Sequence, residues 1–176
     1  HTPQSLLDGM NLMQPNINTD PLIDGGIQDV TIFHQVTGIL SSNSVIKGLL
    51  SFYNNGYLNL TIGSEVYPNG PNGEQTGAVT GFDGWNTVYI ALNELGFNEN
   101  GWQWDWTGTD HEGFDHTNTT ALEDLVSILA HEAIHAKHNA DFLTAFHANG
   151  MNMSDTRNWM IAQGYNTDYI NAWFTV

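Results

Sequence analysis

TTALEDLVSILAHEAIHAKHNAD, residues 119–141, decides the fold prediction, because it contains the only spacing in the chain that packing alone does not explain. Within it, His131, Glu132 and His135 form an HExxH pattern. On an α-helix, residues four positions apart lie on one face, one turn apart, so both imidazoles can bind the same metal ion. Glu132 lies about 100° further round the helix. It is therefore placed beside the metal, as a candidate general base for a metal-activated water.

The same stretch has the features of an amphipathic helix. Thr120 and Glu123 form a predicted capping box, and Asp124 adds negative charge to the first turn, where the helix dipole favours it. Apolar residues recur at helical spacing and form one stripe, made of Leu122, Leu125, Val126, Leu129, Ala133 and Ala136. On this helical wheel the two histidines point nearly opposite the stripe. We expect one side of the helix to enter a core and the histidines to face a cleft.

This helix resembles the active-site helix of the zincin metallopeptidases. The wording AHEAIHAKH, residues 130–138, is similar to zincin-like domains at the ends of bacterial Rhs-type polymorphic proteins, and HEAIHA is similar to Spartan-type DNA-crosslink proteases. The resemblance implies an α+β fold, a compact zincin-like domain with a small mixed sheet, an HExxH helix and a mostly helical C-terminal part. It also implies Zn²⁺ as cofactor, a peptide or protein substrate, and a secreted or cell-surface location in bacteria.

Length and composition favour one globular domain. The chain has 176 residues, of which 40% are hydrophobic, and this is enough to bury a substantial core. Residues 1–30 are rich in Asn, Asp, Gly and Pro, so we predict an irregular N-terminal arm there and a single domain over residues 31–176. The start lacks an initiating Met and a signal peptide, so we expect a fragment or mature form of a larger protein.

Charge and cysteine content exclude several classes of partner and site. Nineteen acidic residues against three basic ones give a formal charge of −16, so phosphate backbones and anionic membrane surfaces should repel the chain. We therefore expect no nucleic-acid partner, which argues against a Spartan-like role, and no membrane partner. The chain has no cysteine, so any transition-metal site must be built from His, Asp and Glu.

Periodicity and turn residues predict the other elements. These are a strand at Val30–Phe33, a helix at Ser44–Asn54, a strand at Tyr57–Ile62, a loop at Gly63–Gly77, a strand at Trp85–Leu92, a helix at Ser154–Gln163 capped by Ser154, and a short helix after Tyr165. From its place before the HExxH helix, the zincin resemblance implies that Val88–Leu92 forms the upper rim of the cleft and pairs with an extended substrate.

Catalytic zinc usually has three protein ligands, so one more is expected. Asp141 is favoured, because it follows His131 by ten residues, where the metzincin pattern HExxHxxGxxD places its last ligand. His138 stands where that pattern has Gly, the residue that lets the chain turn back. The alternatives are His147 at a Spartan-like spacing, Asp155 on the next helix, and His138 if the helix breaks at Ala136 or Lys137. Met151 and Met153 are candidates for a methionine turn beneath the metal.

Three further groups have both a functional and a structural interpretation. Trp102, Trp104 and Trp106 are candidates for an aromatic shelf or for core residues. The cluster of Asp110, His111, Glu112, Asp115 and His116 is a candidate calcium (Ca²⁺) site or a solvated loop. Tyr165 and Tyr169 are candidates for stabilising an oxyanion or for core packing.

The sequence therefore predicts a zinc-dependent metallopeptidase in which His131, His135 and Asp141 hold the metal and Glu132 is the general base. The alternative is a non-catalytic zincin-fold binding module with a structural metal and an aromatic ligand surface. An open site that loses activity with a chelator distinguishes the enzyme from a closed site that unfolds when the metal is removed.

Overall fold

The computed structural model describes residues 17–18, 30–55, 58–105, 108 and 115–174. The chain divides into two compact units, His1–Lys137 and His138–Val176, and the boundary lies inside one long helix. Most of the predicted N-terminal arm lies outside the described residues, and the single domain over residues 31–176 stays a prediction.

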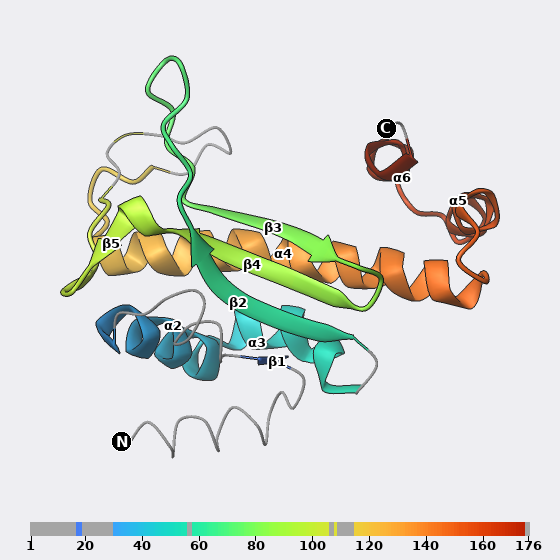
Figure 1. The fold of residues 1–176 in the computed structure, drawn as a ribbon, viewed down its shortest axis with the longest axis horizontal. Helices are drawn as coiled ribbons and strands as arrows, with labels where there is room; N and C mark the ends of the chain where they lie inside the picture. Colours follow the sequence, from blue (N-terminus) through green and yellow to red (C-terminus); the bar gives the residue numbers. More distant parts are fainter. Residues whose placement is uncertain (1–16, 19–29, 56–57, 106–107, 109–114, 175–176) are drawn as a thin grey trace. The chain divides into compact units, whose positions relative to one another are not determined.

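The fold class is α+β, as predicted, with helices and a small mixed sheet (Figure 1). In chain order the described elements are β1 (Ile17–Asn18), α2 (Val30–Ser42), α3 (Ser44–Leu50), η2 (Ser51–Asn55), β2 (Asn59–Glu65), β3 (Ala78–Asp83), β4 (Thr87–Asn93), η3 (Glu94–Gly96), β5 (Phe97–Asn98), β6 (Gly101–Trp102), α4 (Ala121–Ala148), α5 (Met153–Ala162) and α6 (Thr167–Phe174).

The main sheet has the strand order β1-β2-β4-β3. β2 pairs in parallel with β1 and β4, whereas β3 pairs antiparallel with β4. β4 is therefore hydrogen-bonded on both sides and has no free backbone edge for a substrate. The expectation that Val88–Leu92 forms the substrate-binding rim is wrong, because strand order along the chain does not reveal which strand is outermost. Among the described strands, the outer position next to β4 belongs to β3, which the sequence analysis did not predict.

One face of this sheet forms the core of the first unit. Leu60 and Ile62 of β2 and Val88 and Ile90 of β4 are buried at alternate positions. Thr80 of β3 is paired with Ile90. Cross-strand partners project to the same face, so the Thr80 side chain lies on the buried face as well. In Figure 1 β3 and β4 pass in front of the part of α4 that belongs to this unit, and the Thr80–Glu132 hydrogen bond joins that part of the helix to this face.

The start of α2 corrects one prediction. Val30–Phe33 was expected to be a strand because Val, Thr, Ile and Phe favour pleated sheets. Instead, these residues open the helix α2. The buried residues of α2 recur at helical spacing, at Ile32, Phe33, Val36, Ile39 and Leu40. Burial of this longer stripe therefore outweighs the strand preference of four residues.

The predicted helix at Ser44–Asn54 is present as α3 followed by the 3₁₀ helix η2. The Asn43 side chain caps α3 by accepting hydrogen bonds from the backbone N–H groups of Val45 and Ile46. Tyr53 of η2 is fully buried, and its hydroxyl donates a 2.7 Å hydrogen bond to the carbonyl oxygen of Ala136. This bond ties η2 to the first half of α4.

The predicted helix around HExxH is α4, and its capping box is partly as expected. The Thr120 hydroxyl accepts from the Glu123 N–H at 3.2 Å and donates to the Glu123 carboxylate. Of the predicted apolar stripe, Leu125, Leu129, Ala133 and Ala136 are buried. Leu122 is 47% exposed, so the buried face of α4 is rotated away from it.

In the second unit, α5 and α6 confirm the two predicted C-terminal helices. The cap of α5 is Asn152 and not Ser154, because the Asn152 side chain accepts from the Asp155 N–H at 2.9 Å. Gly164 follows α5 with φ +82°, a conformation that favours glycine. None of the described helices combines the length and the apolarity that crossing a bilayer requires.

Candidate metal and catalytic site

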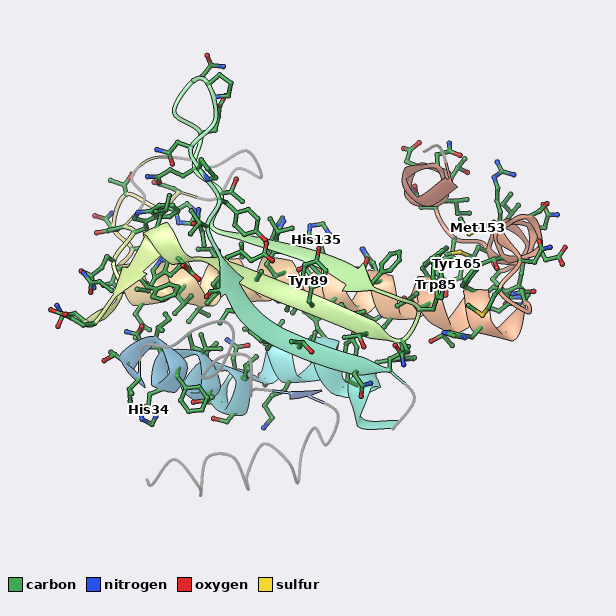
Figure 2. The ribbon with its side chains drawn as sticks, viewed as in Figure 1. His34, Trp85, Tyr89, His135, Met153 and Tyr165 are labelled. Carbon is green, nitrogen blue, oxygen red and sulfur yellow. The ribbon has the colours of Figure 1, made fainter. Side chains whose placement is uncertain are left out.

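The two histidines of the HExxH pattern converge on α4, as their four-residue spacing predicts. Their Nε2 atoms lie 3.0 Å apart, and their ring centroids lie 4.7 Å apart with an interplanar angle of 71°. Both side chains are exposed. His135 is labelled in Figure 2 on the part of α4 that passes the sheet. The rings therefore present two nitrogen donors to the same point.

This separation fits a shared metal ion. Tetrahedral zinc with Zn–N bonds near 2.05 Å places two ligand nitrogens about 3.3 Å apart. The observed 3.0 Å between the His131 and His135 Nε2 atoms differs from that value by only a few tenths of an ångström. Two neutral imidazoles at this distance can instead share one proton, because each ring has one donor and one acceptor. The two Nε2 atoms are thus close enough either to bind one metal ion or to form a hydrogen bond with each other.

Glu132 differs from its neighbours in being buried. Its side chain is 7% exposed, and the Thr80 hydroxyl of β3 donates a 2.5 Å hydrogen bond to its Oε2. Burial raises the pKa of the Glu132 carboxyl, while the Thr80 hydrogen bond and the two histidines act in the opposite direction. The HExxH pattern predicts a carboxylate beside a metal but gives no sign of Thr80, because Thr80 and Glu132 are 52 positions apart in the chain.

No cluster of side chains in the described part of the chain identifies the third metal ligand. Within the described ranges, no group of three or more His, Cys, Asp or Glu side chains is placed to hold a metal ion. α4 is helical throughout Ala121–Ala148, so it contains no break at Ala136 or Lys137, which a His138 ligand requires. Asp141, which is half-buried, and His147 lie still further along the same unbroken helix, about 15 and 24 Å along its axis from His131. The unbroken helix therefore keeps both side chains away from an ion held by His131 and His135, which corrects the prediction of Asp141 as third ligand: that spacing requires the chain to turn back where His138 stands. Asp155 stays a prediction.

The proposed methionine turn falls in the connection between α4 and α5. Met151 is 45% exposed and has φ 60°, and Met153, labelled in Figure 2, opens α5 with 42% exposure. Their placement beneath a metal also stays a prediction.

The candidate calcium cluster is only partly described. Asp110, His111 and Glu112 lie outside the described residues. Asp115 accepts hydrogen bonds from the backbone N–H and hydroxyl of Thr117. The His116 Nδ1 lies 2.6 Å from Asp124 Oδ1, with both side chains buried. His116 thus anchors the first turn of α4, a role that the sequence analysis did not assign to it.

Trp102, the first of the three tryptophans at positions 102, 104 and 106, is part of the core. Trp102 is 3% exposed, and a Cβ added at Gly96 would meet its ring at 2.5 Å, so this tryptophan packs directly on the glycine backbone. Trp104 is half-buried and contacts Trp102 edge to face, with ring centroids 5.8 Å apart. Trp106 lies outside the described residues. The interpretation of Trp102 as part of an exposed aromatic shelf for a ligand is therefore wrong, because its side chain is buried.

The candidate oxyanion residues belong to the second unit. Tyr165 is half-buried beside Trp159, and with Gln163 and Gly164 these residues line a shallow hollow of about 330 Å³. The side chain of Tyr169 lies outside the described residues. Neither observation tests the expected role.

Comparisons with family models, curated proteins and solved structures gave no match to this chain. The function of the chain is therefore inferred from its residues and their geometry.

Proposed function

We propose that the chain is a zinc-dependent metallopeptidase. The observation that supports this most is the pair of Nε2 atoms on His131 and His135, 3.0 Å apart and exposed, next to a buried carboxylate on Glu132. Two imidazole nitrogens that can bind one metal ion, and an adjacent carboxylate that can act as a base, are the groups that metal-assisted hydrolysis requires.

In this proposal His131 and His135 hold zinc, and the third protein ligand comes from outside the unbroken helix α4. Zinc bound there supplies a Lewis acid that polarises the scissile carbonyl and lowers the pKa of water toward 7. The exposure of both rings favours an open site, in which one coordination position is left for water or substrate. A purely structural site is closed by four protein ligands instead, so this exposure argues against the binding-module alternative.

Glu132 acts as general base on the attacking water and later gives the proton to the leaving amine. Burial raises the pKa of its carboxyl, which makes it a stronger base than an exposed glutamate. Its contact with Thr80 places the carboxylate at the edge of the sheet.

β3 is the strand that we assign to substrate binding, in place of Val88–Leu92. It pairs with β4 on one side, and its other side has no strand partner among the described residues. An extended peptide can add to such an edge through backbone hydrogen bonds. Since Thr80 on β3 contacts Glu132, a peptide bound there runs past the proposed base.

Replacing Glu132 by Gln tests the proposal. The Glu132→Gln variant should bind zinc with the stoichiometry of the wild type and lose about 10²- to 10⁴-fold in kcat, because an amide cannot accept the proton. The matched control is Glu123→Gln, which changes an exposed glutamate in the first turn of the same helix. Full activity of Glu132→Gln contradicts the proposed role of Glu132.

A chelator separates the enzyme from the binding module. We expect a peptidase assay to show loss of activity with chelator and recovery with added Zn²⁺, while circular dichroism shows that the helices remain. Unfolding of the protein when zinc is removed, with no peptidase activity in the zinc-loaded form, would favour a structural metal.

A further inference from the structure

We propose that Thr80 is the positioning residue for Glu132, fixing which carboxylate oxygen receives the proton; this inference rests on the proposed peptidase function. Thr80 and Glu132 both belong to the first compact unit. The Thr80 hydroxyl lies 2.5 Å from Glu132 Oε2 and 3.3 Å from the Glu132 carbonyl oxygen. One short side chain therefore contacts both the carboxylate and the backbone of the proposed base.

The sheet register explains how Thr80 reaches this place. Its pairing with Ile90 turns its side chain to the buried face, where α4 packs. Threonine is β-branched and has few χ1 rotamers, so its hydroxyl direction is set by the backbone of β3. The position of Glu132 is thus determined by a strand as well as by its own helix.

The hydrogen bond distinguishes the two oxygens of the Glu132 carboxylate. Oε2 accepts from Thr80, whereas Oε1 has no hydrogen bond among the described residues. A proton taken from water therefore goes to Oε1. Because the Thr80 hydroxyl holds Oε2, the carboxylate does not have to lose rotational freedom at the moment of reaction.

The first test compares Thr80→Val with Thr80→Ser. Valine has the shape of threonine without the hydroxyl, so we expect kcat to fall about 10- to 100-fold, the loss that a hydrogen bond to a charged group corresponds to. KM and zinc stoichiometry should stay within about twofold. Thr80→Ser keeps the hydroxyl and should recover most of kcat. The matched control is Thr61→Val on β2, a half-buried threonine of the same sheet, and its kcat should be that of the wild type.

A double variant tests whether Thr80 acts through Glu132. In the Glu132→Gln background, Thr80→Val should cause no further loss of the residual rate. An equal fold loss in both backgrounds would show that Thr80 acts independently of Glu132 and would overturn the inference.

Urea unfolding of the metal-free protein separates this inference from the proposed function. Thr80→Val should lower the urea midpoint, because it leaves a buried carboxylate oxygen without its donor, and it should do so much less in a Glu132→Ala background. This coupling without any zinc-dependent peptidase activity would uphold the contact and reject the proposed function. Equal midpoint shifts in both backgrounds would reject the positioning role even in an active enzyme.

Discussion

Hydrogen bonds of Tyr67 fix the start of the loop that follows β2. The Asn93 side chain accepts from the Tyr67 N–H and donates to the carbonyl oxygens of Tyr67 and Thr76, so it holds both ends of this loop. The Tyr67 hydroxyl donates a 3.0 Å hydrogen bond to the Glu65 carboxylate. Burial, followed by this hydrogen bond, raises the pKa of Tyr67 from 10.0 to about 12.

A pH dependence of stability follows from this shift. The unfolded state loses the Tyr67 proton near pH 10.0, whereas the native state keeps it to about pH 12, so the stabilising contribution is complete below pH 10 and is lost as pH rises through that window. Urea unfolding at several pH values should show a steeper loss of stability for the wild type than for Tyr67→Phe. Identical slopes in the two proteins would contradict the assigned contact.

Two kinds of contact stabilise the N-terminal turn of the helix α4. Asp124 is fully buried, accepts from the Thr119 hydroxyl at 2.9 Å and pairs with His116 at 2.6 Å, whereas Thr120 caps the helix from an exposed position. Both contacts lie before His131 on the helix that carries the candidate site.

Asp124→Ala should therefore cost more than Thr120→Ala. Removing one member of a buried pair leaves the other without its partner and lowers the free energy of unfolding by about 3 kcal/mol, while loss of a cap costs about 1 kcal/mol. Urea unfolding of the two variants measures the difference. Equal losses would show that the His116–Asp124 pair does not anchor the helix.

The net charge of the whole molecule affects which peptides approach it. A formal charge of −16 attracts cationic peptides and repels acidic ones over a distance set by ionic strength. If the chain is a peptidase, kcat/KM for a lysine-containing peptide should exceed that for its glutamate-containing counterpart by roughly tenfold at low salt.

The salt dependence provides the check on this prediction. Raising NaCl should reduce the ratio of the two kcat/KM values, and a neutral peptide of the same length serves as the control. A ratio that does not change with salt would mean that local contacts, and not the field of the molecule, discriminate the peptides.

The elements with a clear period were predicted well. The helices α3, α4, α5 and α6 and the strands β2 and β4 appear close to their predicted ranges, because alternation or helical spacing of apolar residues reports a buried face directly. The strand predicted at Val30–Phe33 was wrong, because four residues of strand preference are too few to decide against a longer helical stripe. β3 contains Gly81 and only six residues, so its pattern is weak.

That His131 and His135 share one face of a capped helix could be predicted from the residues alone, because their separation of four residues and the helical repeat are both local properties. The burial of Glu132 against Thr80 of the outer strand and the pairing of His116 with Asp124 depend instead on how the chain folds. Strand order and the packing of a helix on a sheet bring distant residues together, and no periodicity along the chain records which residues meet.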